Sequence, residues 1–383
     1  MSRLGTETAF QVLAQAKALE SEGKDIVHLE IGEPDSDTPD HIVESAIQAL
    51  REGWHHYTPA AGILELREAI AKEISITRRI SVDPEQVVVT PGAKPIIFFS
   101  LLALVESGDE VIYPNPGFPI YQSMIECAGA RAVAIPLREQ LDFRLDVQEL
   151  LQALTPRTRV VILNSPSNPT GSVLSGDDLA QLAEALADTE IVVLSDEIYS
   201  HILYQGEHQS IASLPGMKKR TIILDGFSKT YAMTGWRLGY GVMHAELAEQ
   251  VTKLMINSNS CTAAFTQVAG IAALKSDQTP VAKMVETFRE RRDHVVKLLN
   301  QIKGISCQVP LGAFYVFPRV SDLGLKSSEL ERLLLHEAGV AALSGTAFGE
   351  HGEGYLRISY ATSLNELDKG VERIAQVARK LQS

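Results

Sequence analysis

The sequence has few cysteines, no excess of basic charge and no long apolar run. Its three cysteines, Cys127, Cys261 and Cys307, lie far apart and lack the spacing of a metal site, so we expect no metal and buried free thiols in a reducing compartment. A formal net charge of −13 argues against a nucleic-acid surface. Because no run approaches the ~18–20 apolar residues of a membrane span, we expect a cytoplasmic enzyme without membrane or nucleic-acid partners.

Targeting segments and repeats are also lacking. Residues 1–17 include Glu7 and have no apolar core of the kind found in signal peptides. The absence of repeats and low-complexity segments argues against a multi-domain adaptor with disordered linkers. The 383 residues, of which 45% are apolar and 22% charged, suffice for two domains, or for one large domain with a smaller partner.

Short apolar runs alternate with helical patterns from residue 86 onward, which is typical of an α/β layer fold. Their nearly continuous valine, isoleucine and leucine content suits strands that are covered on both faces, as in a mainly parallel sheet. Ligands of such sheets bind beyond the carboxyl ends of the strands. The predicted strands are 86–90, 110–113, 132–136, 160–164, 191–195, 221–224 and 238–243.

The two ends of the chain differ from this middle part. We expect a helix over 6–22 and a strand over 25–31 near the N-terminus, then a long charged helix from about residue 284 and a strand over 355–360. These parts are predicted to join as a smaller α+β domain. The expected division is therefore a large domain of residues 33–280 and a small domain of residues 1–32 and 281–383.

Several polar residues follow the predicted strands or interrupt them. Lys229 comes after the strand 221–224, and burial there would suit a nucleophile or Schiff-base former; Arg237 would suit a phosphate. Asp196, at the mouth of a buried strand, needs a cation or caps a helix. Arg357, between apolar neighbours on a strand, needs an anionic partner. Taken singly, Lys229 and Arg237 could equally be surface residues.

The stretch 225–240, with Ser228-Lys229 followed by Gly-Trp-Arg-Leu-Gly, resembles the lysine signature of the class I/II aminotransferases, which are fold type I pyridoxal-phosphate enzymes. Similar motifs begin at Tyr57 (Y-T-P-x-x-G), Asn168 (N-P-x-G) and Asp196 (D-E-x-Y). The resemblance extends from about residue 26 to residue 367. It implies pyridoxal 5'-phosphate as cofactor and a large three-layer domain with a mainly parallel seven-stranded sheet, plus a smaller α+β domain.

The resemblance assigns the cofactor's ring to five residues. Lys229 is expected to bind the cofactor as a Schiff base and to move the substrate proton, and Asp196 to keep the pyridine nitrogen protonated. Tyr199 and Asn168 are expected to hydrogen-bond the phenolic oxygen. Phe118 is expected to stack on the ring. The catalytic residues are then Lys229, Asp196 and Tyr199.

The phosphate is assigned to another set. Arg237, Ser228 and the turn formed by Gly92, Ala93 and Lys94 at a predicted helix start are expected to bind it, although this turn alone could be a plain tight turn. Gly226 stands where the family often has serine, and Ser228 is a partial substitute. Tyr57 is expected to reach the phosphate of a second chain, which implies a homodimer with composite sites.

Substrate contacts are expected from Gly32, Asn168, Arg357 and Lys94. Arg357 matches the residue that binds the α-carboxylate, and Lys94 matches one that binds an acidic side chain in the aspartate/prephenate branch; it could instead be a helix-start lysine without substrate contact. The expected reaction moves an amino group between an L-amino acid, possibly aspartate, and a 2-oxo acid such as 2-oxoglutarate.

Other donors and reactions stay open. Residues 256–267 offer no counterpart of the distal arginine of some aspartate transaminases, so an apolar or aromatic donor is an alternative. A pyridoxal-phosphate lyase or decarboxylase could use the same fold. A regulator with an aminotransferase-like domain is disfavoured because the chain has no spare DNA-binding segment.

Overall fold

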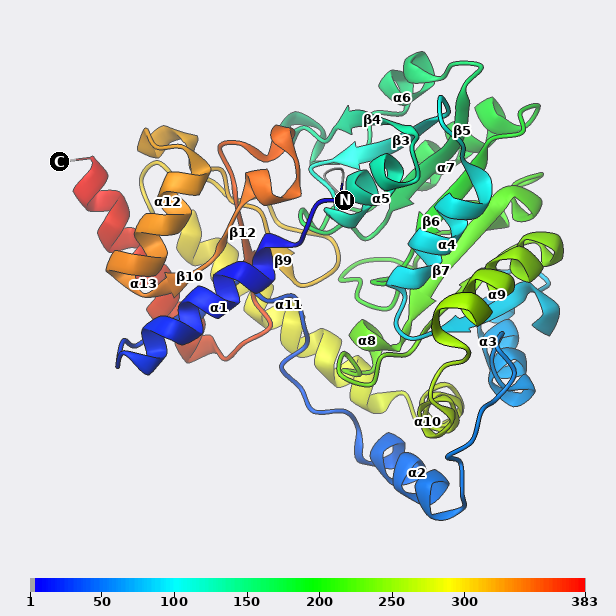
Figure 1. Cartoon of the computed structure of the whole chain (residues 1–383). Coiled ribbons are helices and arrows are strands. Elements are labelled where there is room, and N and C mark those ends of the chain that lie inside the picture. The colour runs from blue at the N-terminus through cyan, green and yellow to red at the C-terminus, as the bar shows by residue number, and fades with distance from the viewer. Residues whose placement is uncertain (1–3, 383) are drawn as a thin grey trace.

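A seven-stranded sheet forms the centre of residues 4–382, the part of the chain that the computed structural model describes (Figure 1). Its order is β2-β8-β7-β6-β5-β3-β4, and β8 alone runs antiparallel to its neighbours. Each predicted strand is present, and no strand end is shifted by more than two residues. The strands are β2 (Val87–Thr90), β3 (Glu110–Asn115), β4 (Arg131–Pro136), β5 (Thr158–Asn164), β6 (Val192–Asp196), β7 (Thr221–Gly226) and β8 (Gly239–Val242).

Helices cover both faces of this sheet, so successive strand residues enter different cores. Leu194 of β6 packs into the core of one face, while Val193 packs into that of the other. The first face is covered by α4 (Lys94–Leu104), α5 (Ile120–Cys127) and α9 (Ala245–Asn259). The second is covered by α3 (Leu64–Thr77), α6 (Val147–Ala153), α7 (Gly176–Leu186) and α10 (Ala264–Lys275), with α2 (Asp40–Arg51) outside α10. The three-layer α/β prediction is confirmed.

A second region combines the two ends of the chain. Helix α1 (Thr8–Ser21) packs its buried face on Leu335, Leu343 and Phe348, and lies across the orange and red elements of Figure 1. The first strand pairs in parallel with a C-terminal one. The elements are β1 (Val27–His28), α11 (Thr279–Leu299), β9 (Tyr315–Val316), α12 (Ser327–Leu333), β10 (Val340–Ala341), β11 (Leu343–Ser344), β12 (Leu356–Ser359) and α13 (Leu364–Leu381).

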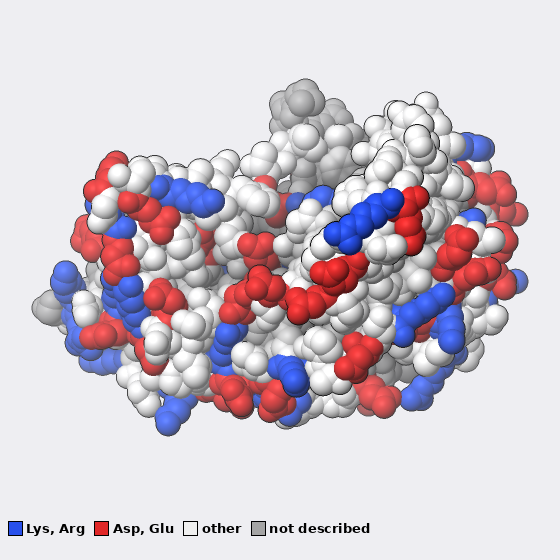
Figure 2. All heavy atoms as spheres, turned by 90° about the horizontal axis from the view of Figure 1, so that it is seen from below, with Lys and Arg blue, Asp and Glu red and all other residues white. Residues whose placement is uncertain are grey.

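Some details differ from expectation. The strand predicted over 25–31 is shorter, because β1 covers only Val27–His28. The Leu29 N–H still donates to the Ala341 carbonyl, and the chain beyond it lines a cavity. All three cysteines are free, but only Cys307 is buried. Cys127 is exposed at the end of α5 and Cys261 is partly exposed, so the expectation of buried thiols is wrong for these two. Within residues 4–382, no helix is long and apolar enough to cross a membrane. Figure 2 shows basic and acidic side chains interspersed over one face.

Candidate active site

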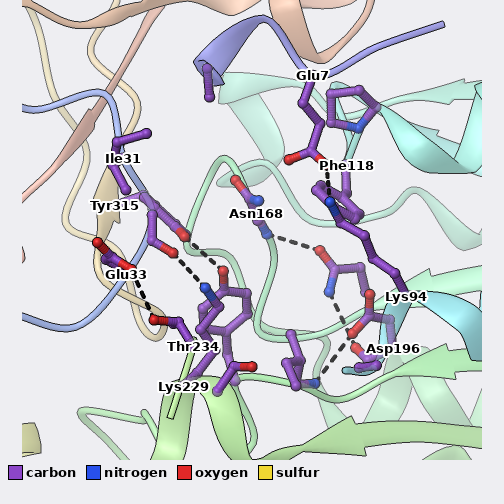
Figure 3. A pocket seen from close by; sticks show the side chains of 18 of the residues that line it. Glu7, Ile31, Glu33, Lys94, Phe118, Asn168, Asp196, Lys229, Thr234 and Tyr315 are labelled. Atoms are coloured by element: carbon purple, nitrogen blue, oxygen red, sulfur yellow. Dashed lines mark hydrogen bonds and ion pairs between the residues drawn. The ribbon is translucent and has the colours of Figure 1, made fainter. Parts of the chain in front are cut away.

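A cavity of about 510 Å³ lies where the carboxyl ends of the parallel strands face the second region (Figure 3). Eleven of the thirteen predicted site residues line it, while Gly92 and Tyr57 do not. Because these residues are distant in sequence, the sheet edge and the second region must both be in place to form the cavity. The lining residues are Gly32, Ala93, Lys94, Phe118, Asn168, Asp196, Tyr199, Ser228, Lys229, Arg237 and Arg357.

Lys229 stands on α8 (Phe227–Thr230), a single turn that follows β7 directly. Its Nζ donates a hydrogen bond to the carbonyl oxygen of Gly32, which comes from the second region. Burial lowers the pKa of Lys229 to about 8, an effect that the Glu33 carboxylate partly opposes. At pH 7 about a tenth of such an amine is in its neutral, nucleophilic form, far more than for an ordinary lysine.

Gly226, just before α8, departs from the signature for a steric reason. A Cβ at this position would lie 3.0 Å from Gly239 Cα on the neighbouring strand and 3.3 Å from the Leu238 carbonyl oxygen. Any side chain would therefore press on β8. Ser228 lines the cavity, so its hydroxyl is the one placed to contact a bound anion.

Asp196 ends β6 and is buried. The Tyr121 hydroxyl donates to Oδ2 over 2.5 Å, and the Ile198 N–H donates to Oδ1 over 3.2 Å. Burial raises the pKa of Asp196 to about 7. No cationic side chain of the described residues forms an ion pair with it. A buried carboxyl group facing a cavity without a cation fits a protonated ring nitrogen.

Arg357 is the complementary case. It lies on β12, with its guanidinium carbon 4.6 Å from the Tyr315 ring centroid and 4.9 Å from that of Phe348. One terminal nitrogen donates to the Glu30 carbonyl and the other to Asn168 Oδ1 over 3.4 Å, whereas Nε has no partner among residues 4–382. Burial lowers the pKa of Arg357. A buried guanidinium without a carboxylate ion pair is suited to bind a carboxylate ligand.

Asn168 and Tyr199 are held rigidly. The Asn168 N–H donates to Asn164 Oδ1 over 2.8 Å, and the Asn168–Pro169 peptide bond is cis. The hydroxyls of Tyr199 and Tyr315 are hydrogen-bonded at 2.7 Å. Gly32 lies against the same Tyr315 hydroxyl, which a Cβ at residue 32 would approach to 2.2 Å. Only glycine fits here, and the missing side chain leaves the backbone of residue 32 open to the cavity.

A second group of hydrogen-bond donors, Arg237 and the start of α4, lies at another side of the cavity. Arg237 donates to the Thr234 carbonyl over 2.7 Å, and its other donors have no hydrogen-bond partner within residues 4–382. Gly92 has φ +86°, and a Cβ there would lie 2.2 Å from Arg237 Nη2, so glycine lets the guanidinium approach the start of α4. Ala93 caps α4, whose first N–H groups favour an anion. This donor set fits a phosphate.

Several lining residues were not predicted, among them Glu7, Phe10, Tyr315 and Phe348. The Lys94 ammonium, predicted for cofactor or substrate, forms an ion pair with the Glu7 carboxylate. Tyr57, by contrast, lies in the loop between α2 and α3 with 89% of its surface exposed, and does not reach the cavity of its own chain.

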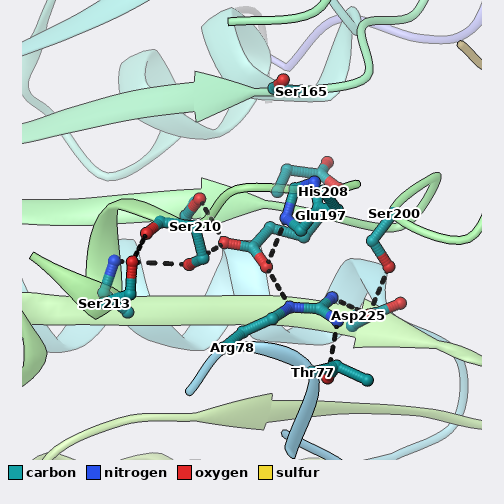
Figure 4. A network of polar contacts seen from close by, with 12 residues as sticks. Thr77, Arg78, Ser165, Glu197, Ser200, His208, Ser210, Ser213 and Asp225 are labelled. Carbon is teal, nitrogen blue, oxygen red and sulfur yellow. Dashed lines mark hydrogen bonds and ion pairs between the residues drawn. The ribbon is translucent and has the colours of Figure 1, made fainter. Parts of the chain in front are cut away.

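A buried polar network ties the strand ends together behind the cavity (Figure 4). Arg78, at the end of α3, donates to Glu197 Oε2 over 2.7 Å and to Asp225 Oδ2 over 2.8 Å. Glu197 follows the last residue of β6, and Asp225 lies near the end of β7. His208 Nε2 lies 2.9 Å from Glu197 Oε2. One guanidinium thus joins the strands that carry Asp196 and lead to Lys229.

Comparisons with known proteins agree with this geometry. The family model described as aminotransferase class I and II matches residues 24–374. The chain is 43% identical to an aspartate aminotransferase of Pyrococcus abyssi over 93% of this chain and 92% of that protein. It is 42% identical to aromatic-amino-acid aminotransferase 2 of Thermococcus litoralis over 93% and 92% of the two chains. A solved aspartate aminotransferase from Thermus thermophilus with maleate has a TM-score of 0.95, with 36% identity over 98% and 99% of the two chains.

Proposed function

This chain belongs to the class I and II aminotransferases, which use pyridoxal phosphate to move amino groups between amino acids and 2-oxo acids, and from that premise we propose roles for its site residues. The observation that carries the proposal is a pair of unmatched buried charges in the cavity that Lys229 lines. Among the residues that the structure describes, no cationic side chain pairs with Asp196 and no carboxylate pairs with Arg357. The ring nitrogen of the cofactor would pair with Asp196, and the α-carboxylate of the substrate would pair with Arg357.

The cofactor would be held by residues of the large domain. Lys229 would bind its aldehyde carbon and Asp196 its ring nitrogen, while Arg237, Ser228 and the start of α4 would hold its phosphate. Phe118 would stack on the ring, and Asn168 and Tyr199 would hydrogen-bond the phenolic oxygen. When bound, pyridoxal phosphate supplies an electron sink for the charge that develops on the substrate Cα.

The chain's own residues would then orient the substrate and transfer its Cα proton. Arg357 binds the α-carboxylate, and Gly32 lets the backbone approach it, so that the Cα–H bond is presented to Lys229. The neutral Nζ of Lys229 takes the Cα proton as general base and then, as general acid, would deliver it to the cofactor carbon that is joined to the substrate nitrogen. A pKa of about 8 lets one amine do both near neutral pH.

The proposed donor is aspartate or a similar acidic amino acid, with 2-oxoglutarate as acceptor. Lys94 supports this proposal, because a second cation in the cavity suits ligands with two carboxylates. A second candidate is an aromatic donor, which the rings of Phe10, Phe118 and Phe348 around the cavity favour. The named relatives include enzymes of both kinds.

The assembly and place of action are also proposals. A homodimer with composite sites is proposed because Tyr57 is exposed on its own chain and can serve only a neighbouring one. A cytoplasmic location agrees with the three free thiols. The domain division at residues 33 and 281 is supported by a core that consists mainly of residues from the joined chain ends, into which Tyr199, Ile202 and Tyr204 of the large domain also pack.

A donor screen tests this function. The protein loaded with pyridoxal phosphate is mixed with aspartate, alanine or phenylalanine without an acceptor, and conversion to pyridoxamine phosphate is followed by absorbance. We expect conversion with aspartate, reversed by 2-oxoglutarate. Loss of aspartate conversion in Lys94→Ala with phenylalanine conversion kept supports the acidic donor. Substrate breakdown without pyridoxamine phosphate would instead indicate a lyase.

A further inference from the structure

The Lys94 ammonium, which is proposed to bind the distal carboxylate of a substrate, already forms an ion pair with a carboxylate of the protein itself. Glu7 lies directly before α1, and its Oε1 accepts a hydrogen bond from Lys94 Nζ, as Figure 3 shows. The two residues are 87 positions apart and come from different regions of the fold. The Glu7 side chain is only 17% exposed, so its charge is directed into the cavity rather than into solvent.

The surroundings of this pair are mostly aromatic. Lys94 Nζ lies 5.4 Å from the Phe118 ring centroid and 6.0 Å from that of Phe10. Burial lowers the pKa of both Lys229 and Arg357, and the Glu7 carboxylate partly opposes this for each. The direct contact of Glu7 is with Lys94, whereas its effect on Lys229 and Arg357 is a weaker one exerted without contact. Among the lining acids, Asp196 is bound by Tyr121 and Glu33 by Thr234, which leaves Glu7 as the acid paired with Lys94.

We propose that Glu7 stands in for the distal carboxylate of an acidic substrate and thereby sets the choice between acidic and aromatic donors. The inference rests on the proposed function of the same cavity. An acidic donor displaces Glu7 from Lys94. An aromatic donor leaves the ion pair closed, so that no unpaired ammonium faces its ring. One cavity can then accept both classes, at the expense of affinity for the acidic one.

The exposure of the Lys94 side chain sets how strongly its ion pair with Glu7 can change ligand affinity. Lys94 is 39% exposed, and an ion pair of this kind changes binding by a modest factor. We expect that removing the Glu7 charge tightens the binding of a dicarboxylate by about five-fold, and that an aromatic monocarboxylate binds equally well or less tightly.

Calorimetric titration of the pyridoxal-phosphate-loaded protein measures this without turnover. The probes are succinate and 3-phenylpropionate, neither of which carries an amino group. Glu7→Gln should tighten succinate binding about five-fold and not tighten 3-phenylpropionate binding. The matched control Glu22→Gln removes the same charge from the exposed end of α1, away from the cavity, and should change neither affinity. Unchanged or weaker succinate binding in Glu7→Gln, or equal tightening in Glu22→Gln, would overturn the inference.

Lys94→Met separates this inference from the proposed function. It should weaken succinate binding, and adding Glu7→Gln to it should then have no further effect, because the competitor has lost its partner. If Lys94→Met weakens succinate binding but Glu7→Gln does not tighten it, only the role of Glu7 fails. If Lys94→Met leaves succinate binding unchanged, both the acidic-donor assignment and the role of Glu7 fail.

Discussion

Burial shifts the pKa values of Lys229 and Asp196 so that the neutral form of each side chain is favoured. The pKa of Lys229 falls to about 8 and that of Asp196 rises to about 7. A cation bound against Asp196 would lower its pKa again and keep it ionised. The site is therefore incomplete in its charges until a ring nitrogen and a carboxylate are present.

Replacing Lys229 removes the attachment point of the cofactor. We expect Lys229→Ala to lose turnover by at least about a thousand-fold, because no other amine can move the Cα proton. Mass spectrometry after borohydride reduction should show the cofactor mass on the unaltered protein and not on the variant. A variant that still carries the cofactor covalently would place the attachment elsewhere.

The lowered pKa of Lys229 predicts a pH profile for cofactor loading. Below about pH 8 the amine is protonated and lacks a free electron pair, so the rate at which cofactor-free protein takes up pyridoxal phosphate should rise with pH. Above about pH 8 the amine is neutral and the rate should level off. Stopped-flow absorbance measures this. A rate that climbs on toward pH 10 would indicate an ordinary lysine.

Arg357 offers a test of carboxylate binding. Arg357→Lys keeps the charge but loses the planar pair of donors, so we expect KM for amino donors to rise about 30- to 100-fold, roughly 2–3 kcal/mol of binding. Arg159→Lys, on an exposed arginine paired with Asp109, is the control and should leave KM unchanged. Steady-state kinetics over a range of donor concentrations separates KM from kcat. An unchanged KM in Arg357→Lys would contradict the assignment.

At the scale of elements, the sheet was predictable and the second region less so. Strands such as β2, β3 and β5 contain a short apolar run that is buried on both faces, so the local sequence is enough to predict their positions. The edge strand β4 is only partly buried. Strands β9, β10 and β11 have two residues each, too few for any periodicity. The antiparallel direction of β8 depends on how the chain returns to the sheet, which no local pattern records.

The site residues likewise fall into those that the sequence predicted and those that it did not. Asp196, Lys229 and Asn168 follow strands, and the carboxyl edge of a parallel sheet brings such residues together. Glu7 and Tyr121 lie at or on helices, where a single acidic or aromatic residue reads as surface or core. Their contacts with Lys94 and Asp196 arise from packing between distant segments.

The end of α3 provides a test of how the strand ends are held. Arg78 is 2% exposed and joins Glu197 to Asp225, whereas its neighbour Arg79 is 78% exposed and pairs with Glu207. Arg78→Met should lower the free energy of unfolding by about 3–5 kcal/mol, because two buried carboxylates lose their cation. Arg79→Met should change it by less than about 0.5 kcal/mol. Urea denaturation measures both, and equal effects would mean that the network does not hold the strands.

At the scale of the whole molecule, the exposed Tyr57 is the feature that a single chain leaves unexplained. An aromatic side chain with 89% exposure contributes almost nothing to the stability of its own chain. Leu64 on α3 and Ile256 on α9 also have about half of their surface exposed. A second copy of the chain that covered these residues would bring Tyr57 to a neighbouring cavity.

Mixing two defective variants tests whether the sites are shared. Lys229→Ala chains retain Tyr57, and Tyr57→Ala chains retain Lys229, so a mixed dimer contains one site with both residues intact. If Tyr57 acts across the interface, activity after the two variants are unfolded and refolded together should exceed the sum of their separate activities. The same variants refolded apart and then combined are the control. No gain on co-refolding would mean that each cavity works with the residues of one chain alone.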